Sequence, residues 1–186
     1  MGLTPVGLAA QMGRPAILTE LLEHMSESDI RLQADLALFL AAPTGHVEVA
    51  EALLARGTQL SWRDKLGRTA FHKAAEHGHD AVVDLLLEYD ADIEDVNEMG
   101  ETALINSAKN GQTEVTRTLL DNGANPLTVD NIKCSALSWT FLGGHQATVK
   151  TLLDYMPMAD IQETFDALSS SWIWKCSHDT SNRPSG

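Results

Sequence analysis

Positive charge is scarce in this chain of 186 residues, which has 13 lysines and arginines against 26 aspartates and glutamates. The formal net charge of −13 at pH 7 leaves nothing to offset phosphate repulsion, so we expect no nucleic-acid partner. Long apolar runs are also missing, because the longest fall well short of the ~18 residues that a membrane-spanning helix needs. We therefore expect neither nucleic acid nor membrane among the partners.

Cysteine is nearly absent, since Cys134 and Cys176 are the two in the chain. Two cysteines cannot build the disulfide framework on which small secreted domains depend. No cationic segment followed by an apolar stretch opens the sequence, so we do not expect a secretory signal. These features predict a cytoplasmic protein, with the nucleus as the alternative.

Motifs that carry chemistry are missing as well. The sequence contains no Gly-rich phosphate loop, no nucleophile elbow and no paired-carboxylate motif. Cys176, His178 and Asp179 near the C-terminus are too few ligands for a convincing metal site. We expect no catalytic residue, no cofactor and no metal, so a binding protein is favoured over an enzyme.

An internal repeat is the strongest feature that is present. Gly45, Gly78, Gly111 and Gly144 stand 33 residues apart, and Gly13 precedes the series by 32. A pair of leucines follows each glycine at the same distance: Leu21-Leu22, Leu53-Leu54, Leu86-Leu87, Leu119-Leu120 and Leu152-Leu153. Small residues precede most of these glycines. A period kept over five copies by separate markers predicts a tandem repeat.

Elementary physical chemistry explains why these residues recur. A turn at Gly67 leads into Thr69, whose hydroxyl can cap a short alanine-rich helix. Gly78 then ends that helix in a conformation that other side chains resist. Val82 and Leu86 lie on one face of the second helix that follows. A single unit cannot bury that face alone, so the units are expected to stack and share one core, in which Leu86 and Leu120 take part.

At this point the sequence resembles the ankyrin repeat. The stretch 64–93, DKLGRTAFHKAAEHGHDAVVDLLLEYDADI, is close to the full unit of that family, and NEMGETALINSAKNGQTEVTRTLLDNGANP is a second good copy. Along the chain, the first repeat, at about residues 1–28, matches only the helical part of the unit. The second repeat, at about 29–63, lacks the turn glycine and threonine. The resemblance implies an all-α ankyrin-repeat solenoid of helix-turn-helix units joined by β-hairpin-like turns. The array would cover residues 1–155, as repeats at about 1–28, 29–63, 64–96, 97–129 and 130–155.

After residue 155 the repeat pattern stops. Ile161, Phe165, Leu168 and Trp172 follow one another along one stripe of a predicted helix. We interpret residues 156–176 as a C-terminal capping helix over the fifth repeat, and a partner-binding helix is the alternative. Residues 177–186 have the composition of a disordered tail.

The histidines of LGRTAFHKAAEHGH are the clearest candidates for a site. His72 occupies the histidine position of the family's TPLH tetrad, which implies a local bond that steadies the turn. His46, His79 and His145 each follow a repeat glycine, so we interpret all four as scaffold residues. His77 should instead face the groove. The spacing H-K-A-A-E-H is one residue too long for the H-x-x-E-H arrangement, so its side chains would not converge on a metal.

The resemblance implies binding through the turn tips and the inner face of the first helices. The corresponding partner-binding candidates are Arg63, Lys65, Leu66, Arg68, Glu76, His77, Glu98, Met99, Glu101, Lys109, Asn110, Asn131, Ile132 and Leu142. Apolar residues recur every 33 positions at Leu66, Met99 and Ile132, which predicts an apolar ladder across three tips.

Charge changes abruptly along the same surface. The tip residues Arg63 and Arg68 should point into solvent, whereas residues 74–108 contain no lysine or arginine and ten acids. This boundary predicts a polar groove and a partner that is acidic at one end and basic at the other. The expected partner is a loop or helix of another protein with an apolar anchor, and the chain itself is expected to be a monomer or part of a larger complex.

The alternative function is a small-molecule-binding protein or an unorthodox enzyme that uses the groove around His77, Lys109 and Trp139. The further residues that would line such a site are Lys73, Glu76, Asn106 and Asn110. A deep, closed pocket at these residues would favour this alternative, and a flat groove would count against it.

Overall fold

The computed structural model describes residues 3–161, and α-helices dominate this part of the chain. The helices are α1 (Pro5–Gln11), α2 (Pro15–Glu23), α3 (Glu27–Ala41), α4 (Val47–Leu54), α5 (Ala70–His77), α6 (Asp80–Glu88), α7 (Ala103–Lys109), α8 (Thr113–Asp121), α9 (Ala136–Gly143) and α10 (Gln146–Tyr155). A short 3₁₀ helix, η1 (Ala42–Thr44), extends α3.

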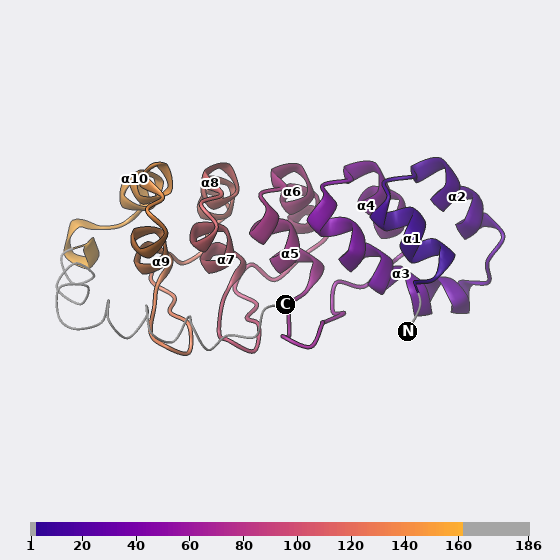
Figure 1. Ribbon diagram of the computed structural model, residues 1–186, viewed down its shortest axis with the longest axis horizontal. Coiled ribbons are helices and arrows are strands. Elements are labelled where there is room, and N and C mark those ends of the chain that lie inside the picture. The colour runs from indigo at the N-terminus through magenta and orange to yellow at the C-terminus, as the bar shows by residue number, and fades with distance from the viewer. Residues whose placement is uncertain (1–2, 162–186) are drawn as a thin grey trace.

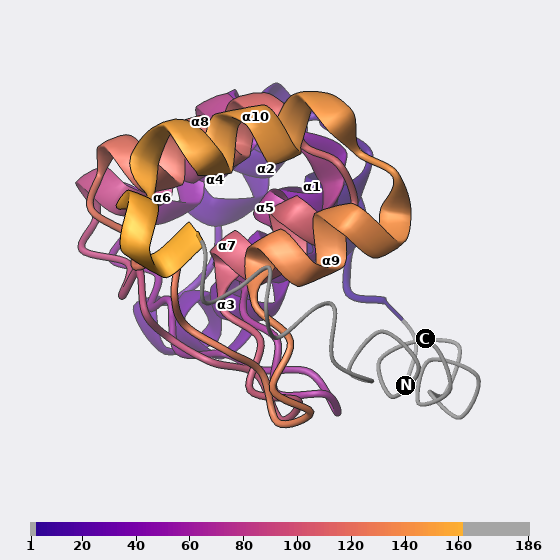
Figure 2. The ribbon, with the colours of Figure 1, turned by 90° about the vertical axis from the view of Figure 1, so that its left-hand side faces the viewer.

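The helices form two layers along an elongated array (Figure 1). One layer contains the first helix of each pair, in which α5 contacts α7 and α7 contacts α9. The other contains the second helices, in which α6 packs between α4 and α8. The loops that precede α5, α7 and α9 project from the first layer to one side (Figure 2). This is the all-α solenoid that the sequence predicts, and its hairpin-like loops contribute one isolated bridge, Val129–Ser135, in the described residues.

The first helices begin and end where the repeat markers predict. Thr102 and Ser135 occupy equivalent N-cap positions, and their hydroxyls accept hydrogen bonds from the backbone N–H groups of Ile105 and Ser138. Such caps satisfy donors that the first turn of a helix leaves unpaired. At the other end of α5, Gly78 adopts a left-handed conformation with φ of 80°.

The degenerate second repeat folds differently from the others. The segment that would form a turn lacks the glycine and threonine, and α3 therefore continues for 15 residues from an N-cap at Ser26. The rings of Phe39 and Trp62 lie 4.5 Å apart between their centroids. In the next repeat the positions 33 residues later are His72 and Asp95, which are joined by a hydrogen bond. An aromatic contact thus replaces a polar one at the same junction.

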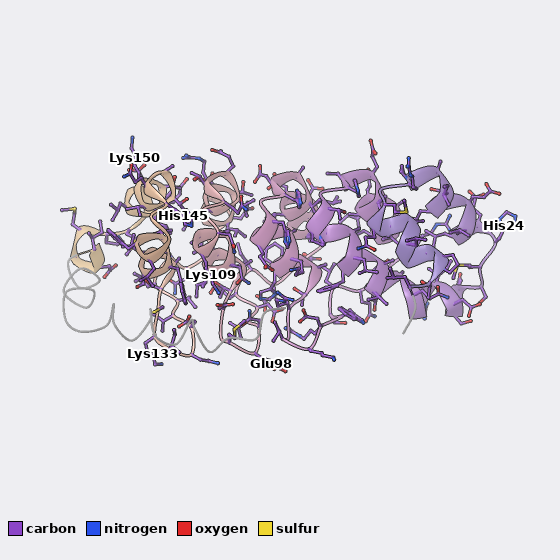
Figure 3. All side chains as sticks on the ribbon, viewed as in Figure 1. His24, Glu98, Lys109, Lys133, His145 and Lys150 are labelled. Carbon is purple, nitrogen blue, oxygen red and sulfur yellow. The ribbon has the colours of Figure 1, made fainter. Side chains whose placement is uncertain are left out.

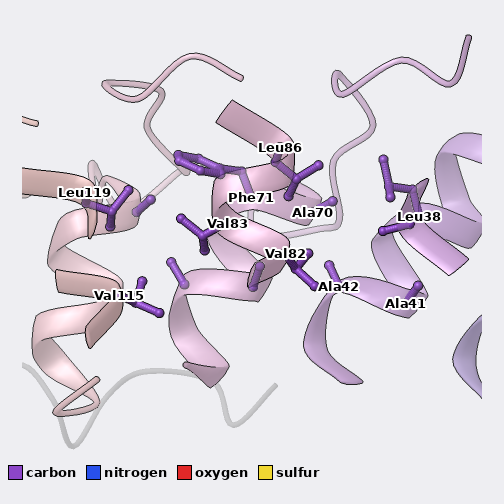
Figure 4. Close-up of a cluster of buried hydrophobic side chains, with 14 of the residues drawn as sticks. Leu38, Ala41, Ala42, Ala70, Phe71, Val82, Val83, Leu86, Val115 and Leu119 are labelled. Carbon is purple, nitrogen blue, oxygen red and sulfur yellow. The ribbon is translucent and has the colours of Figure 1, made fainter. Parts of the chain in front are cut away.

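One continuous core runs through the array, from Val6 to Met156. Figure 4 shows Leu86 of α6 between side chains of the preceding repeat, such as Leu38, and side chains of the following one, such as Leu119. The predicted burial of Leu86 and Leu120 is confirmed, because both are core residues. Each repeat therefore depends on its neighbours to bury its apolar face.

The predictions for the C-terminal region fall largely outside the described residues. Ile161, the last of them, is half-buried against the core. Phe165, Leu168, Trp172 and the predicted tail lie beyond it, as do Cys176, His178 and Asp179, which were judged too few for a metal site. Across residues 3–161, no helix combines the length and the apolar character that crossing a bilayer requires. The repeat boundaries remain predictions.

Candidate functional site

The candidate site is a stripe of side chains along one face of the first helices, in which Asn106 and Trp139 are buried and the other members are at least partly exposed. In α5 the residues Phe71, Ala74 and Ala75 are buried. Lys73, Glu76 and His77, at the i, i+3, i+4 spacing, are not buried. We call the equivalent positions the groove stripe. It consists of Leu8, Gln11, Met12, Leu40, Pro43, Thr44, Lys73, Glu76, His77, Asn106, Lys109, Asn110, Trp139, Leu142 and Gly143.

A ladder of hydrogen bonds holds the first helices side by side. The side chains of His79, Gln112 and His145 donate to backbone carbonyls at the ends of the preceding first helices. The accepting carbonyls belong to Pro43, Glu76 and Lys109, at distances of 2.9, 3.3 and 3.2 Å. Helix C-termini leave such carbonyls unpaired, so the ladder satisfies groups that would otherwise be orphaned. Figure 3 marks Lys109 and His145 on neighbouring repeats.

The repeat glycines make room for this ladder. A Cβ atom added to Gly45 would lie 2.4 Å from the ring of His79, and one added to Gly111 would lie 2.5 Å from His145. Both glycines also have φ near 70°. The recurrent glycine therefore serves both the backbone turn and the close approach of the next repeat. The prediction that the histidines after the glycines are scaffold residues is confirmed for His79 and His145.

His72 is also a scaffold residue, as predicted, and it joins two repeats. Its Nδ1 accepts a hydrogen bond from the backbone N–H of Thr69 at 3.3 Å, which steadies the turn. Its Nε2 donates to the carbonyls of Asp95 (3.1 Å) and Glu101 (3.2 Å) in the following hairpin. Burial lowers the pKa of His72 below its ordinary value, although the Asp95 carboxylate acts in the opposite direction. The neutral ring is thus the form that this junction requires.

Arg68 of the first hairpin and Lys73 of α5 are paired with carboxylates. Arg68 lies 2.7 Å from Asp64 and 3.4 Å from Glu76, and Lys73 lies 2.7 Å from Glu76. Burial tends to raise the pKa of Asp64, but hydrogen bonds from Arg68 and from the backbone of Leu66 outweigh it, so the pKa falls below its ordinary value. The side chain of Arg68 is only 19% exposed, so the prediction that it points freely into solvent is wrong.

The next repeat contains the same pair with its signs exchanged. Glu101 lies 3.1 Å from Lys109, at the positions that Arg68 and Glu76 occupy one repeat earlier. Glu101 also accepts a hydrogen bond from the amide of Asn97 at 2.9 Å. It is 1% exposed, so its prediction as a surface contact for a partner is wrong. A carboxylate becomes buried here because a cation and an amide compensate for its lost hydration.

Arg63 connects two successive hairpins. Its guanidinium lies 2.7 Å from Asp95 and donates to the carbonyl of Gly67 at 2.8 Å. Arg63 is exposed, but together with Arg68 it shows that the basic tip is neutralised by nearby acids. The polarity predicted from the linear order of charges is therefore much reduced in the folded chain, because the acids that follow in sequence fold back onto the bases.

The apolar ladder at the tips is held in position by backbone hydrogen bonds. The N–H of Glu98 donates to the carbonyl of Leu66 at 3.0 Å, and that of Asn131 donates to Met99 at 2.9 Å. Leu66, Met99 and Ile132 are each half-buried and occupy the same place on three hairpins. The other tip candidates Lys65, Glu98 and Asn131 are exposed, and Figure 3 shows Glu98 at the end of its loop.

On the helices, the stripe is polar in its centre and aromatic toward its C-terminal end. His77 and Asn110 are exposed, and Leu142 is half-buried against the core. The Nζ of Lys109 lies 4.8 Å above the Trp139 ring, so the structure brings together these two residues of the alternative site. His77 is not in contact with them in the described interactions; its Nδ1 bonds to the carbonyl of Lys73 at 2.9 Å.

Two features of the stripe escaped the sequence reasoning. Asn106 is 5% exposed, and within residues 3–161 its Nδ2 is a buried side-chain donor without an acceptor. At the N-terminal end, Leu3, Leu8 and Met12 are exposed. Placing α1 in the register of α5 was the signal that could have identified Leu8 and Met12 as groove residues.

The largest of the described depressions lies away from these residues. It has a volume of about 460 Å³ and lies between the loops that follow α4 and α6. Its lining includes Gln59, Arg63, Tyr89 and Asp92, none of which is in the groove stripe. In the described part of the chain, no three histidine, cysteine, aspartate or glutamate residues are arranged to hold a metal ion.

Comparison with known proteins agrees with this architecture. A family model described as ankyrin repeats in three copies matches residues 6–97 and, a second time, residues 90–165. The two matches together cover most of the chain. No curated protein matches it.

Proposed function

The chain belongs to the ankyrin-repeat family, and on that premise we propose that it is a protein–protein interaction module that binds through the groove stripe and the hairpin tips. Ankyrin repeats generally mediate interactions between proteins. The observation that carries the proposal for this surface is a contrast in exposure. Met12, His77 and Asn110 are exposed at the same position of the first, third and fourth repeats and Thr44 is half-buried at that position of the second, while the opposite faces of these helices are buried.

Preorganisation supports the same surface. The bonds from His79 and His145 fix the spacing of the first helices, and the bonds from Glu98 and Asn131 fix the spacing of the tips. Because the helices and tips are already held in place, a partner that binds there immobilises few further groups of this protein. Little binding free energy is therefore lost to conformational entropy. The contacts offered are a row of half-buried apolar side chains beside a row of polar ones.

The expected partner is a loop or helix with an apolar anchor. Arg63, Arg68 and Lys73 are engaged with carboxylates of the same surface, so these three cations are not the groups that would attract an acidic partner. Apolar anchors dominate most interfaces, whereas charges at the rim mainly steer the encounter. Leu66 and Met99 are the tip residues that such an anchor would contact.

Site-specific photocrosslinking tests the proposal. A benzophenone side chain placed at His77 or Asn110 should capture a protein partner from the native source. The matched control is Asp84, which is exposed on α6 in the other layer. Capture at Asp84 with none at His77 or Asn110 would place the binding surface on the second helices and refute the proposal.

A second candidate function is small-molecule binding next to Trp139. The observation that favours it is the unpaired donor on Asn106, at the position in α7 that Trp139 occupies in α9. A buried donor without an acceptor is costly, and a ligand oxygen would satisfy it. Native mass spectrometry of protein purified from its source tests this function, since a bound small molecule should appear as a discrete added mass that Asn106→Ala removes. A single peak at the mass of the chain would exclude it.

A further inference from the structure

The N-terminal end of the groove carries an apolar surface, which we call the α1 patch and define as Leu3, Leu8, Met12 and Leu40. Leu3, Leu8 and Met12 are 51%, 46% and 55% exposed, and Leu40 is half-buried. Gly7 lies at its centre: a Cβ atom there would lie 3.1 Å from Leu40 Cδ1 and 3.9 Å from Leu3 Cδ2. The side chains of Leu3 and Leu40 therefore both lie next to a helix position that has no side chain of its own.

The α1 patch is continuous with the groove stripe. Leu8 and Leu40 occupy the position of Lys73, and Met12 occupies that of His77. The helices that carry these residues, α1 and α3, are packed against each other. In the first two repeats the stripe contains no charged residue, whereas in the next two it contains Lys73, Glu76 and Lys109. The groove thus changes from apolar to polar along its length.

We propose that the α1 patch docks one class of ligand, an amphipathic helix of a partner protein with an apolar stripe and a basic polar face. The inference rests on the proposed function and specifies the partner of that same groove. Burial of large exposed apolar side chains supplies the driving force for such docking.

The backbone of α1 explains why the occupant is a helix. Its N–H groups are already used within the helix, as in the bonds from Leu8 to Thr4 (2.9 Å) and from Met12 to Leu8 (3.0 Å). An extended segment laid on the patch would find no backbone partner for its own N–H and C=O groups. A helix satisfies those groups internally and presents only side chains.

Charge complementarity explains why the polar face of that helix is basic. The protein has a net charge of −13, and no lysine or arginine belongs to the α1 patch or to the stripe of the first two repeats. A basic helix would be attracted over long range and would meet no lysine or arginine among the residues of the patch itself.

A defined peptide probe tests the proposal. The probe is a fluorescein-labelled peptide of about 18 residues made of leucine and lysine alone, with leucine at the i, i+3, i+4, i+7 spacing. The matched peptide has the same composition in scrambled order, so that net charge is identical and the apolar stripe is lost. Fluorescence anisotropy at ~0.15 M salt measures both dissociation constants. The patterned peptide should bind at least about tenfold more tightly than the scrambled one.

Variants of the protein locate the binding surface. The Leu8→Ser, Met12→Ser double variant should weaken binding of the patterned peptide by about tenfold or more. Met12→Ser alone, at the more exposed residue, should give a smaller loss in the same direction. The control is Ile17→Ser, which removes a side chain of similar exposure (56%) from α2 and should change affinity less than about twofold. Thermal melts of all variants should match the wild type.

The outcomes separate this inference from the proposed function. The proposal that the α1 patch docks an amphipathic helix is overturned if the two peptides bind with equal affinity. It is also overturned if the double variant binds the patterned peptide as tightly as the wild type does. If affinity is then lost with His77→Ser and Asn110→Ser, the groove still binds partners, but elsewhere along its length. If only Ile17→Ser and other changes on the second helices weaken binding, the partner binds neither at the α1 patch nor in the groove, and both proposals are wrong.

Discussion

His72 shows how one buried side chain can connect two repeats. Its ring is buried, accepts a hydrogen bond from Thr69 in its own turn and donates to carbonyls in the next hairpin. These roles require a neutral ring with its proton on Nε2, because a carbonyl can only accept. Burial lowers the pKa of His72 below its ordinary value of 6.5 because the protonated ring would lose its hydration, and this outweighs the hydrogen bonds to the carbonyls, which act in the opposite direction.

This arrangement predicts a pH-dependent contribution to stability. Because the folded pKa is lower than the unfolded one, the unfolded chain binds the proton first as the pH falls. The stabilisation should be complete above about pH 6.5 and should decline as the pH falls from there toward the folded pKa. Urea unfolding of wild type and His72→Gln at several pH values between about 7.5 and 5.5 measures it. The variant should be less stable by ~1–3 kcal/mol at the upper pH, with a difference that shrinks in acid. A difference independent of pH would contradict the role assigned to the neutral ring.

At the scale of the element, the hairpins before α5 and α7 are each joined to their own helix by an ion pair. Arg68 connects the first hairpin to α5 through Glu76, and Glu101 connects the second to α7 through Lys109. The signs are opposite, and the geometry of the hairpins is the same. Where these two positions are charged, the fold therefore needs a compensated pair rather than a particular charge, and the hairpin before α9 has Cys134 and Leu142 there instead.

Removing Arg68 should consequently destabilise the protein. Arg68→Ala leaves Asp64 and Glu76 without their guanidinium partner, and we expect a loss of ~1–2 kcal/mol in the free energy of unfolding. The matched control is Lys65→Ala in the same hairpin, where the side chain is exposed and the change should stay within ~0.5 kcal/mol. Thermal and urea melts at low and high salt distinguish the two variants. If Arg68→Ala proves as stable as Lys65→Ala, the pairing has no structural role.

The hairpin tips should matter for binding instead. Met99→Ala, at the centre of the apolar ladder, should cost ~1–3 kcal/mol of binding free energy, roughly 5- to 150-fold in affinity. The partner captured at His77 is the ligand for this measurement by titration calorimetry. Val96→Ala removes an exposed apolar side chain of the same hairpin that lies outside the predicted contacts, and serves as the control. Affinities that are equal for Met99→Ala and wild type would mean that the ladder is not a contact strip.

At the scale of the whole molecule, stability is a property of the stack. Leu86 contributes to a core that continues into the repeats on both sides (Figure 4). No repeat buries its apolar face without its neighbours, so a local loss is transmitted along the array.

Leu86→Ala tests this coupling. We expect a loss of ~2–5 kcal/mol, with far-UV circular dichroism and tryptophan fluorescence reporting one shared urea transition at a lower midpoint. Leu87→Ala, at the half-buried neighbour, should cost less. Two separate transitions in the Leu86→Ala protein would show that the repeats fold independently of one another.

Much of the repeat architecture of this protein could be predicted from its sequence alone. The spacing of Gly78 and Leu86 predicted two helices per repeat, Thr69 predicted a helix start, and His79 was correctly interpreted as a scaffold residue. These features are local or recur at a fixed period, so one copy of the pattern supports the interpretation of the next. A left-handed glycine or a helix cap acts within a few residues of its own position, and sequence spacing reports it directly.

Only the tertiary structure decided which of the polar and apolar surface residues are free. Arg68 and Glu101 occupy tip positions that looked exposed, yet each meets its partner eight residues later, after the chain has turned back on itself. The repeat register places Leu8 and Met12 in the groove, but how far each side chain is exposed follows from the packing around α1. Burial and pairing depend on distances between segments that a linear sequence does not contain, because a charge is compensated by whatever the fold brings within a few ångströms of it.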